Sequence, residues 1–299
     1  METREWQGKT GGLPWMQRTL IRWLSVIDQR IVYVVLVVVV PFYMLIGHKG
    51  YLSMYHFFHN VRRESWLKAF VHVYANHFRF GQVVVDRFAA FGGRTFKMDV
   101  PDEMWTMYSE LANQEDGFVQ VSCHMGNYEL AGYVLRQPKK TIYPLVFLGE
   151  TETIMQNRAK LFAAQGVEMV PVKQDMSHIF ILNNALREGN VVSMPGDRVF
   201  GSPKSLSCRM FGHDVRFPIG PFQLSVLRGT RMVAVWVMKE SFDTYKVHCF
   251  ELKADETEKQ RVQCQQLADA FARKMEEMID LYPTQWFNYF EFFEQSSSD

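Results

Sequence analysis

One segment near the middle of the chain reads Phe118-Val119-Gln120-Val121-Ser122-Cys123-His124-Met125-Gly126-Asn127-Tyr128-Glu129. Residues 118–123 have the composition of a buried strand, and the run ends at a histidine. A turn-prone Gly-Asn pair follows, and an apolar pattern with helical spacing continues to residue 137. The segment therefore predicts a strand, a tight turn and a helix, with His124 at the carboxyl end of the strand, where open α/β folds place their chemistry.

The spacing between His124 and Glu129 restricts what the two side chains can do. Positions five apart on one continuous helix point in different directions, so this is not the i, i+4 pattern of a helical zinc site. If His124 lies in the turn and Glu129 in the first helical turns, the side chains can meet. A carboxylate there would fix the imidazole tautomer and stabilise the imidazolium. We therefore expect His124 and Glu129 to be the catalytic pair, without a serine or cysteine nucleophile.

Strands and helices alternate on the carboxyl side of this segment. The pattern predicts strands at 141–148, 167–172 and 190–195, separated by helices at 151–165 and 176–188. This alternation predicts an α/β fold with a mainly parallel central sheet flanked by helices. The rest of the chain predicts a loop at 196–208 and a helix at 217–227. It then predicts an antiparallel pair of strands at the sheet edge, 231–239 with 245–252, and an amphipathic helix at 255–281.

The first 50 residues have a different composition. Residues 15–30 have the pattern of a basic amphipathic helix, and residues 31–46 carry no charge. The uncharged run is a little short of the roughly 20 residues that span a bilayer. A buried helix or a β-rich core segment would share its composition, but flanking aromatic and arginine residues favour a membrane anchor. Unpaired cysteines in the rest of the chain favour a cytoplasmic domain, and therefore an in-plane or hairpin insertion over a full span. We therefore divide the chain into a membrane-associating segment, 1–50, and a catalytic domain, 51–299, which begins with aromatic-rich helices through residue 91.

Composition excludes several classes of protein. The chain has 299 residues and a net charge of +1, which gives no bulk electrostatic support for binding nucleic acid. Its four cysteines include no CxxC pair, which argues against a disulfide scaffold or a cysteine-rich zinc site and favours a reducing compartment. Cys123 lies beside His124, but neighbouring strand residues point to opposite faces, so a small buried side chain is the better interpretation.

Several motifs, taken in order, resemble one enzyme family. His124-Met125-Gly126-Asn127-Tyr128-Glu129 is similar to the H-x4-D/E motif of glycerolipid and lysophospholipid acyltransferases, in the form used by the lipid A biosynthesis (late) acyltransferase family. Further blocks that resemble this family are Asn157-Arg158, Gly166, Val170-Pro171, residues 187–198 ending in Pro195-Gly196-Asp197-Arg198, Phe211-Gly212, Phe217-Pro218-Ile219-Gly220-Pro221 and Gln285-Trp286-Phe287. The likeness covers nearly the whole chain.

The resemblance implies an acyltransferase that needs no cofactor and no metal. It implies transfer from an acyl thioester, on acyl carrier protein or coenzyme A, to a hydroxyl of a lipid such as a lipid A precursor or an amino-acid lipid, at the cytoplasmic face of a bacterial inner membrane. We expect the substrate-binding residues to be Gly126, Asn127, Arg158, Asp197 and Arg198. The backbone N–H groups of Gly126 and Asn127 are further expected to stabilise the oxyanion.

Departures from the family pattern leave the acceptor open, and two other functions remain as alternatives. The chain lacks the Phe-Pro-Glu-Gly-Thr-Arg block of glycerol-phosphate acyltransferases, and it has Gly196-Asp197-Arg198 in that place. Neither glycerol phosphate nor lipid A is therefore assured as acceptor. The two alternatives are a non-catalytic membrane lipid-binding protein and a lipid hydrolase that uses the same histidine, although a serine hydrolase is disfavoured because no Gly-x-Ser-x-Gly elbow is present.

Overall fold

The computed structural model describes residues 23, 27–46, 48–130, 139–146, 166–173, 175–199 and 204–293. Three expected helices lie wholly or mostly outside these residues. The helix expected at 151–165 lies entirely outside, and the amphipathic helix expected at 15–30 almost entirely. Only the first turn of the helix expected at 126–137 is described. That first turn is a 3-10 helix, η2 (Tyr128–Leu130).

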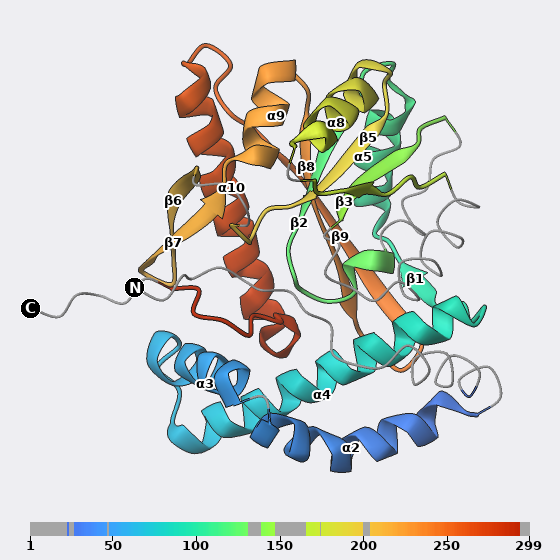
Figure 1. Cartoon of the computed structure of the whole chain (residues 1–299), viewed down its shortest axis with the longest axis vertical. Coiled ribbons are helices and arrows are strands. Elements are labelled where there is room, and N and C mark those ends of the chain that lie inside the picture. The colour runs from blue at the N-terminus through green and yellow to red at the C-terminus, as the bar shows by residue number, and fades with distance from the viewer. Residues whose placement is uncertain are drawn as a thin grey trace, which may run out of the picture.

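The described residues form a seven-stranded sheet in the order β1-β9-β8-β2-β5-β3-β4 (Figure 1). Neighbouring strands are parallel except for the pair β8 and β9. This confirms the α/β class with a mainly parallel sheet. The strands are β1 (Lys97–Asp99), β2 (Phe118–Ser122), β3 (Ile142–Val146), β4 (Val170–Pro171), β5 (Val191–Pro195), β8 (Met232–Lys239) and β9 (Thr244–Leu252).

Helices cover both faces of the sheet. One face packs against α8 (Ser177–Arg187), α9 (Gly220–Arg228) and α10 (Gln260–Leu281), and the other against α5 (Asp102–Asn113). All eight residues of β8 are buried, and alternate ones belong to different clusters: Val235 lies with α5, whereas Trp236 lies with α10. A strand covered on both sides is a continuous apolar run in sequence, as residues 232–238 are.

The N-terminal helices form a layer at one end of the sheet. Helix α2 (Gln29–Ile46) lies alongside α4 (Trp66–Phe91) at the lower edge of Figure 1. In the sequence, α2 and α4 are separated by α3 (His48–His56) and a turn of π-helix, η1 (Phe57–Val61). The helices expected through residue 91 are thus confirmed, and residues 31–46 are helical and not β-rich. By length and composition α2 could cross a bilayer, and only 17 % of it is buried.

Two parts of the fold differ from the sequence expectation. Residues 205–210 are not loop, because β6 (Ser205–Met210) pairs antiparallel with β7 (His213–Pro218) in a hairpin that packs on α10. The antiparallel pair β8–β9 is not at the sheet edge, since β8 also pairs with β2, and β1 flanks β9. Strand order depends on distant contacts that local periodicity does not contain.

The last described residues pack back onto the helical layer. After α10 and the 3-10 turn η3 (Pro283–Gln285), residues 286–293 cross the carboxyl ends of the central strands. Trp286 is fully buried there and meets Phe57 edge to face, with ring centroids 4.7 Å apart.

Candidate active site

Adjacent parallel strands bring His124 and Asp197 together. Strand β2 pairs in parallel with β5, and the last matched residues are Ser122 and Pro195. His124 and Asp197 each lie two residues past that pair, so the register places them opposite one another. The imidazole Nδ1 of His124 lies 2.9 Å from Asp197 Oδ1, and the backbone N–H of His124 donates to Asp197 Oδ2 at 2.9 Å.

The electrostatics of this pair favour a neutral imidazole beside an ionised carboxylate. Burial, assisted by the cationic Arg198, lowers the pKa of His124 below its ordinary value. Burial alone would raise the pKa of Asp197, but His124, Arg198 and the hydrogen bonds from His124 hold that pKa below its ordinary value. An ionised carboxylate only accepts hydrogen bonds, so Nδ1 carries the proton and Nε2 is the basic nitrogen.

Glu129 makes a different contact from the one expected. Its Oε1 accepts a hydrogen bond from the guanidinium of Arg87 on α4 at 2.7 Å, and the side chains of both residues are largely buried. The structure therefore places Glu129 in an ion pair that joins η2 to the helical layer. The carboxylate hydrogen-bonded to the His124 ring is that of Asp197, a residue expected only to bind substrate.

The backbone of the loop after His124 is held by two other segments. The N–H of Gly126 donates to the carbonyl of Gln285 at 2.9 Å, and the N–H of Asn127 donates to the carbonyl of Val237 at 2.7 Å. Both amides are thus engaged within the protein. Either N–H could donate to an oxyanion, as expected from the sequence, only after its present hydrogen bond breaks.

Gly126 is required by the path of this loop. Its φ is +61°, in the left-handed region, and an added Cβ would lie 2.2 Å from the carbonyl oxygen of Val237. Only glycine allows both this backbone conformation and so close an approach of β8.

Arg198 lies beside the pair and is nearly buried. Its guanidinium donates to the carbonyl of Phe287 at 3.0 Å and lies 5.4 Å from the ring centroid of Phe290. The ring of Tyr128 meets His124 edge to face, at 5.6 Å between centroids, and Tyr128 is 40 % exposed. Arg158, the remaining expected site residue, lies outside the described residues.

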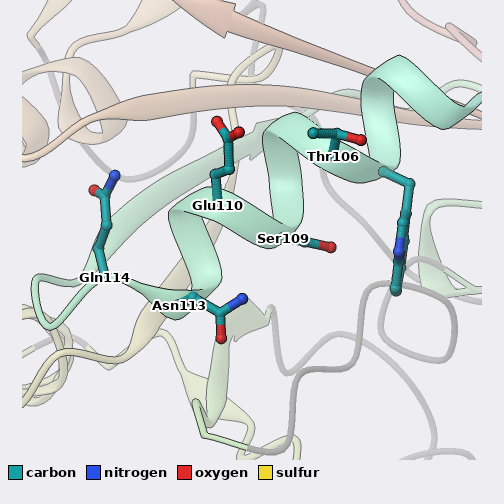
Figure 2. Close-up of a pocket in the computed structure, with 6 residues that line it drawn as sticks. Thr106, Ser109, Glu110, Asn113 and Gln114 are labelled. Carbon is teal, nitrogen blue, oxygen red and sulfur yellow. The ribbon is translucent and has the colours of Figure 1, made fainter.

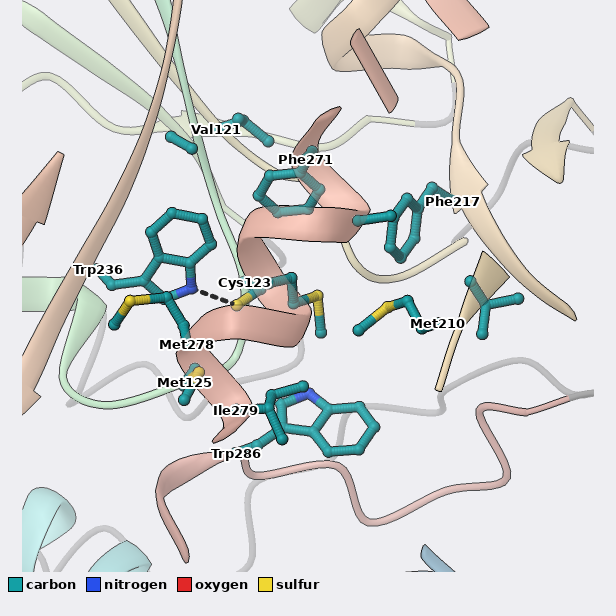
Figure 3. Packing of buried hydrophobic residues seen from close by; sticks show 14 of the residues in the cluster. Val121, Cys123, Met125, Met210, Phe217, Trp236, Phe271, Met278, Ile279 and Trp286 are labelled. Carbon is teal, nitrogen blue, oxygen red and sulfur yellow. Dashed lines mark hydrogen bonds between the residues drawn. The ribbon is translucent and has the colours of Figure 1, made fainter. Parts of the chain in front are cut away.

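Cys123 is part of the core and not of the reacting group. Its Sγ accepts a hydrogen bond from the indole N–H of Trp236 at 3.0 Å, as Figure 3 shows. Burial raises the pKa of the Cys123 thiol well above its ordinary value, which suppresses the nucleophilic thiolate. The interpretation as a small buried residue is confirmed.

A hollow elsewhere on the described surface is unrelated to His124. It lies along α5, and its lining residues all come from that helix or from just after it (Figure 2): Trp105, Thr106, Ser109, Glu110, Asn113 and Gln114. Helix α5 packs on the opposite sheet face from α8, α9 and α10. The site is therefore assigned from the strand ends around His124.

The sequence did not predict the contacts of Arg87, Asp86 and Gln285 with the surroundings of the site. Asp86 and Arg87 follow the apolar run Val83-Val84-Val85 within α4, and an acid in such a run signals a buried partner. The partner itself could not be named, because it comes from a strand 153 residues further along the chain.

Comparisons with known proteins identify the family. The family model described as bacterial lipid A biosynthesis acyltransferase matches residues 106–292, which include His124, Glu129, Asp197 and Arg198. No curated protein matches the chain. A crystal structure of the 1-acyl-sn-glycerophosphate (LPA) acyltransferase from Thermotoga maritima aligns with 87 % of this chain and 99 % of that chain, at 10 % identity and a TM-score of 0.38. Since the family model covers more than half of its length, the chain belongs to the bacterial lipid A biosynthesis acyltransferase family and is an acyltransferase.

Proposed function

We propose that this acyltransferase moves a fatty acyl chain from a thioester to a hydroxyl of a membrane lipid, with His124 as general base. The observation that carries the proposal is the double attachment of His124 to Asp197 at the end of β2. The ring is fixed through Nδ1, so Nε2 is the nitrogen that accepts the proton of an acceptor hydroxyl.

The reaction balances with these groups alone. As Nε2 takes the proton, the acceptor oxygen attacks the thioester carbonyl carbon and an ester bond forms. The carbon–sulfur bond then breaks, and the departing thiolate takes the proton from the imidazolium. The carboxylate of Asp197 stabilises the imidazolium between these steps, the role that the H-x4-E motif predicted for Glu129. We assign Glu129 to holding the loop through Arg87.

Membership of the family supports a thioester donor and a lipid acceptor of the following kinds. We propose acyl carrier protein or coenzyme A as the carrier of the thioester, and a lipid A precursor or an amino-acid lipid as acceptor. Arg198 is proposed to contact the substrate through its cationic guanidinium, either at a phosphate or at the carbonyl oxygen that gains charge. Arg158 remains a second predicted substrate contact. Gly126 and Asn127 are proposed to shape the substrate pocket rather than to donate their backbone N–H groups.

Helix α2 is proposed to lie in the plane of the membrane. Its exposed apolar side chains recur at helical spacing along one face: Ile31, Val34, Val38, Phe42 and Leu45. The opposite face is fixed to α4, where the Tyr74 hydroxyl bonds the carbonyl of Val37 at 3.1 Å. A helix attached lengthwise meets a bilayer side-on. Residues 1–50 would then be the membrane-associating segment, and 51–299 the catalytic domain.

The proposed location is the cytoplasmic face of a bacterial inner membrane. All four cysteines lie in the described part of the chain and are unpaired thiols, which fits a reducing compartment. Thioesters of acyl carrier protein and of coenzyme A are also supplied on that side.

The test is acyl transfer by purified protein in lipid vesicles. Acyl carrier protein and coenzyme A thioesters are each supplied with an extract of bacterial membrane lipids, and products are identified by mass spectrometry. We expect a lipid that gains one acyl chain with the wild type and not with His124→Ala. Release of free fatty acid together with a lipid that has lost one acyl chain, and with no acylated product, would instead identify a lipid hydrolase. Absence of both reactions, in the presence of lipid binding, would identify a non-catalytic lipid-binding protein.

A further inference from the structure

A buried ion pair lies outside the site just described. Asp86 on α4 and Lys239 at the end of β8 have fully buried side chains, and Lys239 Nζ lies 2.6 Å from Asp86 Oδ2. Asp86 also accepts hydrogen bonds from the Tyr33 hydroxyl and the Gln29 amide of α2, and from the Tyr245 hydroxyl of β9. One carboxylate therefore joins α2, α4, β8 and β9.

Stability alone explains such a pair poorly. Removing two charges from water is costly, and replacing a buried pair by uncharged side chains is often neutral or stabilising. The elements that the pair connects are more informative, because they include both the proposed membrane-facing helix and the strand beside the catalytic loop.

Lys239 reaches the catalytic loop through Gln285. The side chain of Gln285 accepts from the N–H of Lys239 at 2.9 Å and donates to its carbonyl at 2.8 Å. The carbonyl of Gln285 in turn accepts the N–H of Gly126, and two residues later the N–H of Phe287 donates to the carbonyl of His124 at 2.9 Å. Residues 285–287 thus pair antiparallel with 124–126.

The same cluster reaches the loop by a second route. The hydroxyl of Tyr245, which donates to Asp86, accepts from the side-chain amide of Asn127 at 3.4 Å. The carbonyl of Trp286 is fixed by the side-chain amide of Asn76 on α4 at 2.7 Å. The loop that carries His124 is therefore bound on both sides to one buried polar cluster.

We propose that Lys239 is a positioning residue for acyl transfer. Its Nζ holds Asp86, which binds α2, and its backbone holds Gln285 of the C-terminal segment 285–287. Through these two contacts Lys239 keeps His124 in position. This inference rests on the proposed function, because the position of His124 affects kcat only if His124 takes part in acyl transfer. A displacement of about 1 Å in a catalytic group can cost on the order of 100-fold in rate.

The test removes both charges at once, so that neither is left buried and unpaired. The double variant Asp86→Asn, Lys239→Met is compared with Arg231→Gln, Glu251→Gln. The control removes the ion pair between Arg231, the residue before β8, and Glu251 of β9, at the opposite end of β8. We expect the first variant to keep KM for both substrates within about twofold and to lose about 10- to 100-fold in kcat. The control is expected to retain wild-type kcat.

Hydrogen exchange gives a readout that needs no activity. Peptides covering residues 123–127 should exchange faster in Asp86→Asn, Lys239→Met and at the wild-type rate in the control. Unchanged kcat overturns the proposal. If the wild type transfers no acyl chain, the proposed function is wrong. The positioning role is then judged by hydrogen exchange alone, and unchanged exchange of residues 123–127 in the double variant overturns it.

A second variant covers the case in which the double variant does not fold. Gln285→Met leaves both charges in place and removes only the two side-chain hydrogen bonds to the Lys239 backbone. The same loss of kcat at constant KM, with faster exchange of residues 123–127, is expected. Wild-type kcat and exchange in folded Gln285→Met would overturn the proposal.

Discussion

Asp197 holds His124 at two points, since one carboxylate oxygen accepts the backbone N–H at 2.9 Å and the other lies 2.9 Å from the ring Nδ1. The carboxylate therefore fixes the position of the residue as well as the tautomer of its ring.

Asp197→Asn should remove most of the activity without unfolding the protein. An amide in that place can donate as well as accept, so the ring adopts the tautomer in which Nε2 carries the proton. We expect kcat to fall on the order of 10³-fold or more, measured by product formation under saturating substrates. Asp214→Asn is the matched control, because Asp214 has an exposed side chain on the β6–β7 hairpin and pairs with Arg209. Equal kcat in the two variants would contradict the role of Asp197.

The pH dependence should show an acid limb below the ordinary histidine pKa. Burial and Arg198 lower the pKa of His124, so the ring loses its proton at a lower pH than an ordinary histidine, whose pKa is about 6.5. We expect kcat/KM to rise with pH in the acid range, with an apparent pKa below about 6.5, and to be level at neutral pH. An acid limb centred above about 7 would show that the ring is held in its charged form.

Glu129 and Arg87 should behave as a structural pair. Glu129→Gln removes the charge that faces the largely buried guanidinium of Arg87, which is expected to cost roughly 3 kcal/mol of the free energy of unfolding. The double variant Glu129→Gln, Arg87→Met should recover most of that loss in denaturant titrations. If kcat stays low when stability returns, Glu129 takes part in the chemistry, as the sequence motif suggested.

Gly126→Ala should disable the loop, whereas Gly212→Ala should not. Both glycines have positive φ, +61° and +78°, so both variants carry the strain of a left-handed alanine, about 1 kcal/mol. Only at position 126 would the new Cβ meet a backbone oxygen, that of Val237, at 2.2 Å; at position 212 nothing lies within 4 Å. We expect kcat to fall about 100-fold or more in Gly126→Ala alone.

The exposed face of α2 should decide membrane binding. Charges introduced by Val38→Asp, Phe42→Asp point away from α4, since these side chains are 62 % and 63 % exposed. We expect sedimentation with phospholipid vesicles to fall about 10-fold or more, while the melting temperature changes little. Val262→Asp on α10 is the control, because it adds a charge at an exposed valine far along the chain. Unimpaired binding by the double variant would exclude α2 as the membrane contact.

The strand and the turn around His124 could be predicted because their signals are local. The strand-like composition of residues 118–122 and the Gly-Asn turn lie within a few positions of the histidine, and the structure has β2 and a left-handed Gly126 there. The acyltransferase family could likewise be predicted, because the order of its motifs along the chain is a property of the sequence.

The partner of His124 could not be predicted in the same way. The sequence offers Glu129 five residues away and Asp197 seventy-three residues away, and sequence separation favours the first. Strand β5 pairs with β2 in a register that places Asp197 opposite His124, while Arg87 from α4 engages Glu129. Strand order and register arise from packing over the whole sheet, which no local window contains.

The sequence by itself determined the strand and the turn at His124 and the family, because these depend on local composition and on motif order. Tertiary structure alone decided which carboxylate meets the imidazole, and it joined Asp86 to Lys239 across 153 positions. The physical reason is that buried polar groups must find hydrogen-bonding partners wherever the folded chain supplies them, regardless of their separation in sequence.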